Sequence, residues 1–358
     1  MKRLLETIGK SINSRLTRRA CCLFCFLAVA AMLPAASAFA ENKPEFEIKL
    51  ATLAPENSSL MQVCNEMNAE VLRETGGKVG FKMFAGFVMG DEEDVLRKLR
   101  VGLVHAAVFT ATALTDMDPA LRSLQIPFLF SNYGEVDYVM EKMEPDFKAA
   151  LLKEGYEVLG WPELGFLYFM STSPIAGLED LKGKKVWAKA NMPMSQAMID
   201  RAGVSTVAIG LPDVLVALQT HLLDVVYNSP YYALVTQWNT QVKYFTDLPL
   251  SYIGGALLVD RKIMAKMPPS LQETVRKVCA AHLQRLNEKT RKDNDEAIQI
   301  ILKRGVQKVT PDAAHVKGFN DLSDEAMAGL DAKFLPPAAV SKVRAALAEY
   351  RAQHPSKP

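Results

Sequence analysis

The sequence predicts an α/β protein of two lobes, each built on a mostly parallel sheet covered by helices. Strand-like apolar runs alternate with amphipathic helical patterns along most of the chain, which is typical of a sheet with helices on both faces. Glycine, proline and helix-capping residues separate these runs, as expected at element boundaries. The chain is also long enough for two domains after removal of an N-terminal export signal.

Residues 1–40 have the three parts of a secretory signal peptide. Six basic residues precede the apolar run 21–33, and the small-residue site Ala38-Phe39-Ala40 follows it. The apolar run is shorter than the ~20 residues that a membrane-spanning helix needs. We expect cleavage after Ala40 and a mature protein in the periplasm, with an uncleaved N-terminal anchor as the alternative.

Cleavage would reverse the formal charge of the chain. Residues 1–40 carry six Lys or Arg and one Glu, so the +2 of the full chain becomes about −3 for the 318 residues that follow. The remaining sequence has no basic run suited to nucleic acid. Its five histidines lack metal-ligand spacing, so neither a metal nor a cofactor is expected.

Two cysteines, Cys64 and Cys279, follow the predicted cleavage site. Each falls on the apolar face of a predicted helix, and free cysteine is commonly buried. We expect two buried free thiols. A disulfide between them is the alternative, because export leads to an oxidising compartment.

The first lobe is predicted from three strand and helix signals in succession. Residues 46–53, 79–84 and 104–110 read as strands. Ser58 or Ser59 can cap a helix that Gly76-Gly77 ends, and Asp91 can cap a helix over 92–100. A helix around 136–152 and strand-like runs at 156–160 and 166–171 follow. The chain is expected to cross between lobes at 161–165.

The second lobe is predicted to contain strands at 186–188 and 206–209 and helices at 194–202 and 212–223. Residues 257–260 return the chain. Ser270-Leu271-Gln272-Glu273 indicates a capping box that opens a long helix to Arg304, and a helical tail follows Pro311. We expect lobe I to comprise 41–163 and about 253–358, with the C-terminal helices, and lobe II to comprise 164–252.

Several short stretches of sequence occur in a characteristic order. They are ATLAPE at 51–56, the glycine-flanked loop at 86–91, LKGKKV at 181–186, LPDV at 211–214 and ALQT at 217–220, closing at Asp224. Together they resemble the substrate-binding subunit of tripartite ATP-independent periplasmic (TRAP) transporters, the DctP-type family. The resemblance covers nearly the whole mature chain.

This resemblance implies a two-lobed periplasmic-binding-protein fold, with two mixed or parallel sheets flanked by helices, a hinge and long C-terminal helices. It also implies a receptor that catalyses nothing, closes on a small organic solute, and hands it to one small and one large membrane subunit of a permease. A sensory or efflux-associated binding module without its own permease is the alternative. No nucleophile elbow or zinc-protease motif indicates an enzyme.

The arginines that hold a carboxylate in that family are replaced here. Leu167 stands two residues after Gly165, where an arginine is frequent, and Trp187 stands at the more characteristic arginine position. An indole offers one N–H and an apolar face, whereas a guanidinium can hold a carboxylate through two donors. We therefore expect an apolar or aromatic ligand that is uncharged or a monocarboxylate. A conventional carboxylate receptor that uses Lys189 remains the alternative.

The candidate ligand contacts combine positions that face the cleft in the family with polar residues at nearby turns. They are Trp187, Lys189, Leu167, Phe166, Tyr227, Asn228, Ser229, Met89, Phe87, Thr110 and Asn57. The apolar members would form the wall, and Asn228 or Ser229 would supply an amide or hydroxyl contact. For each aromatic residue alone, a place in the hydrophobic core is the competing interpretation.

Overall fold

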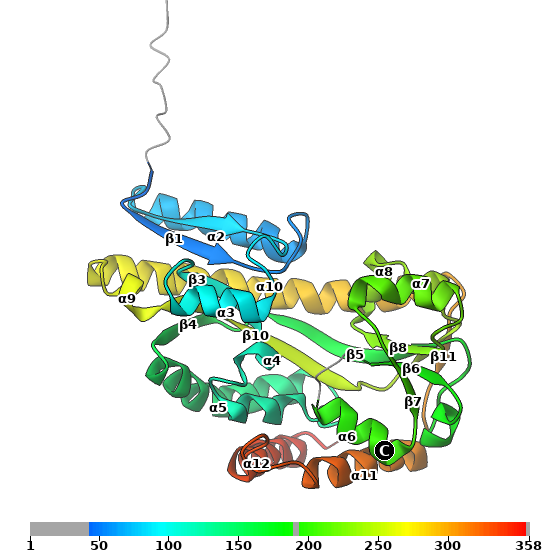
Figure 1. Cartoon of the computed structure of the whole chain (residues 1–358). Coiled ribbons are helices and arrows are strands. Elements are labelled where there is room, and N and C mark those ends of the chain that lie inside the picture. Colours follow the sequence, from blue (N-terminus) through cyan, green and yellow to red (C-terminus); the bar gives the residue numbers. More distant parts are fainter. Residues whose placement is uncertain (1–42, 189–192, 356–358) are drawn as a thin grey trace, which may run out of the picture. The chain divides into compact units, whose positions relative to one another are not determined.

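The computed structural model describes residues 43–188 and 193–355. The signal-peptide prediction and Lys189 lie outside these ranges. The described residues from Pro44 onward form one compact unit, shown in Figure 1. None of the helices in the described ranges combines the length and the apolar character required to span a bilayer.

The described strands form one continuous sheet of eleven strands. They are β1 (Phe46–Ala51), β2 (Val79–Phe84), β3 (Ala106–Thr110), β4 (Tyr156–Gly160), β5 (Glu163–Ser171), β6 (Lys185–Ala188), β7 (Ser205–Ala208), β8 (Val225–Asn228), β9 (Tyr244–Thr246), β10 (Ser251–Asp260) and β11 (Gln307–Val309). The main order is β2-β1-β3-β10-β5-β8-β6-β7. β4 pairs with β10, and β9 pairs with both β5 and β11.

Helices flank the sheet along its length, as Figure 1 shows. They are α2 (Ser59–Glu74), α3 (Glu92–Arg100), α4 (Ala111–Leu114), α5 (Tyr133–Lys153), α6 (Pro193–Ala202), α7 (Val214–Gln219), α8 (Pro230–Val235), α9 (Arg261–Met264), α10 (Pro269–Lys303), α11 (Ala313–Ala328) and α12 (Pro337–Gln353). Short 3-10 helices are η1 (Pro119–Gln125), η2 (Leu178–Leu181), η3 (Leu211–Asp213) and η4 (Trp238–Thr240).

The sheet has two parts, each with parallel pairs. In the first part β1 is parallel to β2 and to β3. In the second part β6 is parallel to β7 and to β8. The antiparallel strands β5 and β10 lie between them, so the mixed α/β class expected from the sequence is confirmed, with the two parts sharing one hydrogen-bonded sheet.

Several helix ends follow the predicted capping chemistry. The Ser58 hydroxyl accepts a hydrogen bond from the Met61 amide, and the Asp91 carboxylate accepts one from the Asp94 amide, as N-cap residues do. The capping-box prediction at Ser270 is wrong. The N-cap of α10 is Pro268, and the helix begins at Pro269, so Ser270 lies inside the first turn and caps nothing. Proline is favourable at the first helical position because the amide there has no partner within the helix.

The predicted helix over 212–223 is also shorter than expected. Residues 211–213 form the 3-10 helix η3, and α7 spans only Val214–Gln219. The chain then turns through His221, which has a positive φ of 55°. This turn brings Leu223 into the core ahead of β8.

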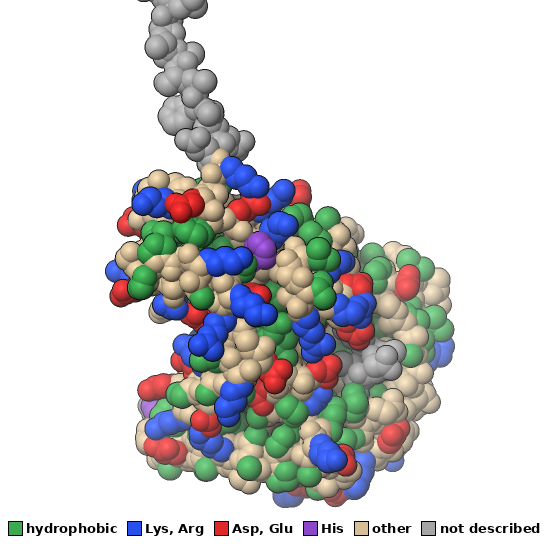
Figure 2. All heavy atoms as spheres, turned by 60° about the vertical axis from the view of Figure 1, so that its left-hand side comes forward, with side chains coloured by type: hydrophobic (Ala, Val, Ile, Leu, Met, Phe, Trp, Pro, Cys, Tyr) green, Lys and Arg blue, Asp and Glu red, His purple; other side chains and the backbone are tan. Residues whose placement is uncertain are grey.

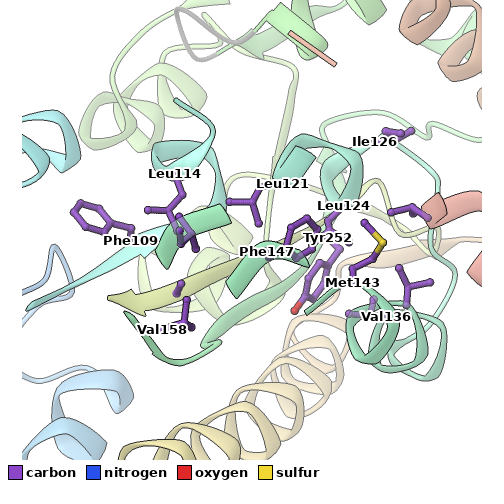
Figure 3. Packing of buried hydrophobic residues seen from close by; sticks show 14 of the residues in the cluster. Phe109, Leu114, Leu121, Leu124, Ile126, Val136, Met143, Phe147, Val158 and Tyr252 are labelled. Atoms are coloured by element: carbon purple, nitrogen blue, oxygen red, sulfur yellow. The ribbon is translucent and has the colours of Figure 1, made fainter. Parts of the chain in front are cut away.

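A large hydrophobic core supports the first part of the sheet. Figure 3 shows Phe109, Leu114, Leu121, Phe147 and Tyr252 converging between strands and the surrounding helices. A second core is formed by residues of β1, β2, β10, α2 and α10. On the face shown in Figure 2, basic and acidic side chains are interspersed, in keeping with the small net charge.

The C-terminal elements contact both parts of the sheet. Figure 1 shows α10 running past strands of each part, and it packs against α2, β4, β5 and α8. β11 pairs in parallel with β9. α11 packs on α6 in the second part, and α12 packs on α5 in the first.

A buried ion cluster joins α10 to the two connecting strands. The fully buried carboxylate of Glu163 accepts hydrogen bonds from the Tyr252 hydroxyl at 2.7 Å and from Arg291 Nε at 2.6 Å. Arg291 also donates to both oxygens of Asp137 on α5. Burial, followed by the nearby Glu163 charge, raises the pKa of Tyr252 well above its usual value, so this hydroxyl stays a donor.

Cys64 on α2 and Cys279 on α10 are both free and buried, which confirms that expectation. Burial raises the pKa of the Cys64 thiol to about 12 and raises that of Cys279 as well. A thiol reacts as its thiolate, so we expect neither to react with Ellman's reagent in the native mature protein at mildly alkaline pH. Both should react after unfolding in guanidinium chloride. Reaction of either thiol in the native state would contradict this packing.

Candidate functional site

A cavity of about 950 Å³ is lined on one side by helices that pack on the first part of the sheet and on the other by strands of the second part and by the connecting strands. Its wall comes from α3, α4 and η1, from β5, β6, β8 and β10, and from α6 and α11. A volume of this order is typical of sites for small organic molecules, which fall at about 300–1,000 Å³. Among the described residues no cluster of His, Cys, Asp and Glu could hold a metal ion.

Five rings that line this cavity contact one another in a chain, which we call the aromatic wall: Phe128, Phe319, Phe169, Tyr227 and Trp187. The ring centroid of Phe319 lies 4.9 Å from that of Phe128 and 6.5 Å from that of Phe169. The centroid of Tyr227 lies 6.3 Å from that of Phe169 and 5.1 Å from that of Trp187. These distances are typical of attractive aromatic contacts.

Trp187 combines a place on the cavity wall with a place in the core. Only 4% of the residue is exposed. Its indole N–H donates to the Ile209 carbonyl at 3.1 Å, and its ring packs edge-on against Trp238. The one polar group of the indole is therefore committed to the protein, and only a small apolar part of the side chain borders the cavity.

Polar groups on the cavity wall come from α3, α4, η1 and β10. The Gln125 amide bonds the Thr112 hydroxyl at 3.2 Å, and the Ser251 hydroxyl donates to the Gln125 carbonyl at 3.0 Å. Glu92 accepts hydrogen bonds from the amide and hydroxyl of Thr110. These bonds fix side chains that border the cavity.

Three arginines also line the cavity: Arg97, Arg100 and Arg122. The first two lie on α3 and are exposed, and Arg97 forms an ion pair with Asp94. The Arg122 side chain is only 13% exposed. Burial lowers the pKa of its guanidinium, and the nearby Asp116 charge opposes that shift.

Some of the ligand contacts predicted from the sequence line the cavity, and others do not. Phe87, Leu167, Trp187 and Tyr227 line the cavity. The remaining described candidates do not, and they are Phe166, Met89, Thr110, Asn228, Ser229 and Asn57. Lys189 lies outside the described residues.

The candidates that miss the cavity have other partners. Phe166 is 3% exposed and packs against Tyr133 and Tyr252. The Ser229 hydroxyl caps α8, and the Asn228 carbonyl oxygen accepts from the Ser229 amide. Met89 packs against the first core, and Asn57 is exposed.

Sequence reasoning missed three important cavity residues, Phe169, Phe319 and Arg122. Phe169 lies two residues beyond Leu167 on the same face of β5, and this period-2 spacing could have suggested it. Phe319 comes from α11, far along the chain, and nothing local indicates that α11 packs beside α6. Arg122 lies in a 3-10 segment where an arginine would ordinarily be solvated.

A sheet in two parts, joined by two strands, with helices of the first part and strands of the second bordering one cavity, is the architecture of a two-lobed solute-binding protein. The sequence profile of the family described as bacterial extracellular solute-binding protein, family 7 (DctP), matches residues 50–332. The chain therefore belongs to this family, which confirms the family expected from the sequence. Because its members are solute receptors, the expectation that the chain is not an enzyme is confirmed too.

Individual relatives are distant in sequence and close in fold. The uncharacterised protein YiiZ of Salmonella typhimurium is 24% identical over 73% of this chain and 80% of its own length. A TRAP periplasmic solute-binding protein from Ochrobactrum anthropi, with its C-terminus bound in its ligand pocket, superposes with a TM-score of 0.78 at 21% identity, covering 86% of this chain and 96% of that one. A protein of the same kind from Desulfovibrio salexigens, with bound orotic acid, gives 0.72 at 18% identity, covering 86% and 99%.

Proposed function

We propose that this chain is the extracytoplasmic receptor of a TRAP-type transporter and that it binds a small organic solute with substantial apolar or aromatic surface, either a monocarboxylate or uncharged. The aromatic wall is the observation that carries this proposal. Its five rings touch in sequence along one cavity. A planar ring inserted against such a surface gains both burial and ring contacts.

The positions that would favour a dicarboxylate are apolar. Leu167 on β5 and Trp187 on β6 both line the cavity, and neither can donate two hydrogen bonds to a carboxylate. A dicarboxylate placed against this wall would lose hydration without gaining a charged partner there, which is costly. The Desulfovibrio salexigens protein holds orotic acid, a planar ring with one carboxylate, so this fold accommodates a ligand of that kind.

Receptor action follows from the way the cavity is shared between the two parts. A ligand that contacts residues of both parts stabilises the arrangement in which they are close together over one in which they are apart. The closed, loaded receptor would then be the form that the small and large membrane subunits of the permease recognise. This partner assignment is tested by co-purification of the mature protein with both subunits, with and without ligand.

A thermal-shift panel on the mature protein tests the ligand class. We expect aromatic monoacids and medium-chain fatty acids to raise the melting temperature and succinate, malate and sialic acid to leave it unchanged. A ligand at one hundred times its Kd stabilises the folded form by about 2.7 kcal/mol, which is readily measured. A response to succinate or malate, with none to the aromatic or fatty acids, would overturn the proposed ligand class and favour a conventional carboxylate receptor.

A further inference from the structure

One cation on the cavity wall is both largely buried and held in place. Nη1 of Arg122 donates to the carbonyl oxygens of Thr115, at 3.3 Å, and Phe334, at 3.1 Å. The guanidinium carbon lies 4.1 Å from the centroid of the Phe334 ring. Two carbonyls and one ring therefore fix the plane of this guanidinium.

The opposite edge of the same guanidinium is open. Both protons of Nη1 are used, but within residues 43–188 and 193–355 no hydrogen bond engages Nε or Nη2. Nη2 lies 3.8 Å from the Asp116 carboxylate, whose side chain is 78% exposed, a weak contact in solvent. The Nε–Nη2 edge is the edge that binds a carboxylate through two parallel hydrogen bonds.

The surroundings of Arg122 suit an acid with an apolar body. Phe334 and Phe128 line the same cavity as Arg122, as do the neutral polar residues Thr112 and Gln125. The other two arginines of the wall are exposed, and one is ion-paired. Among the described arginines of this wall, Arg122 is therefore the one whose side chain is largely buried and whose Nε and Nη2 make no hydrogen bond within the protein.

We propose that Arg122 of η1 receives the carboxylate of the ligand through its Nε–Nη2 edge, while the ligand's ring or chain lies against the aromatic wall. This inference rests on the proposed function. It places the carboxylate partner on the α4–η1 side of the cavity and not on β5 or β6, where Leu167 and Trp187 stand. The ligand class becomes an aromatic or apolar monocarboxylate, and an uncharged solute is excluded.

The test compares an acid with its neutral amide. Isothermal titration of the mature protein with phenylacetate and with phenylacetamide is repeated for Arg122→Gln, Arg122→Lys and the control Arg73→Gln, at an exposed arginine of α2 that does not line the cavity. We expect Arg122→Gln to weaken phenylacetate binding by about 10- to 100-fold, the usual range for a hydrogen-bonded charge, and to change phenylacetamide binding less than about twofold. Arg122→Lys should recover part of the loss because it keeps the charge. Arg73→Gln should have little effect on either probe.

Several outcomes would overturn the assignment. Equal losses for acid and amide would show that Arg122 only holds Thr115 and Phe334 in place, and unchanged phenylacetate affinity would show that another group binds the carboxylate. If the wild type binds succinate instead of phenylacetate, the proposed ligand class fails, and the same variants titrated with succinate decide the role of Arg122 separately. A wild type that responds to amides and to no acid overturns the role of Arg122 alone.

Discussion

Replacement of Arg291 by methionine is expected to lower the free energy of unfolding by about 3–5 kcal/mol, the usual cost of leaving a buried charge without its partner. Glu163 has a fully buried side chain, and Arg291 supplies two of its hydrogen bonds. Methionine fills much of the space but donates nothing. Among the described residues, the carboxylate would then keep only the Tyr252 hydroxyl as a donor. Urea denaturation of the mature protein, followed by circular dichroism, measures the change.

Lys289→Met provides a matched control on the same helix. Lys289 lies two residues earlier on α10, is half exposed, and pairs with Asp293 one turn away. Such pairs contribute about 0.3–0.5 kcal/mol, so the control should unfold close to wild type. Equal denaturation midpoints for the two variants would show that the Glu163 cluster does not support the junction. The double variant Glu163→Gln, Arg291→Met should recover part of the loss, because the unpaired charge is removed.

Trp187→Ala is expected to cost about 3–5 kcal/mol of stability, as other deletions of large buried aromatic side chains do, and to weaken binding of an aromatic acid. The indole packs against Trp238 and Tyr227 and bonds the Ile209 carbonyl. Its loss would open a cavity in the core of the second part and break the aromatic wall in the same place. Urea denaturation measures the loss of stability, and titration with phenylacetate on the same preparation measures the loss of affinity.

Trp187→Phe distinguishes the ring from its N–H. Phenylalanine keeps an aromatic face toward Tyr227 but leaves the Ile209 carbonyl without its donor, which costs about 1–3 kcal/mol for a buried group. We expect this variant to bind phenylacetate nearly as well as wild type. If Trp187→Ala also binds normally, the residue serves only the core and the aromatic wall does not contact the ligand.

The elements that sequence predicted well are those whose signals are local. The caps at Ser58 and Asp91 lie within one turn of the amides they bond, and apolar residues at helical spacing mark α10 from Val275 to Leu286 and again from Ala297 to Ile301. β9 and β11 escaped prediction. Each is only three residues long, and they are stabilised by pairing with each other across some sixty residues of sequence.

Only part of the cavity wall could be predicted from the sequence. Trp187 and Leu167 stand at strand positions that family resemblance pointed to, and both line it. Phe319 and Arg122 are brought there by packing between distant segments. Arg122 is held by the Phe334 carbonyl, 212 residues further along the chain, and no pattern near residue 122 contains that information. Tertiary contacts of this kind override local propensity.

The shared strand β10 has a consequence for how fast a solute can enter and leave. Its residues 251–254 pair with β5 and its residues 255–259 pair with β3, with a register irregularity between Ile253 and Gly254. A Cβ on Gly255 would sit 2.2 Å from the Phe109 carbonyl oxygen, so a side chain cannot be added there without displacing the backbone. We therefore expect any relative motion of the two parts of the sheet to twist this hydrogen-bonded ladder at Gly254 and Gly255. Substitutions that stiffen the backbone at positions 254 and 255 are accordingly expected to change the dissociation rate of the solute, although neither residue lines the cavity.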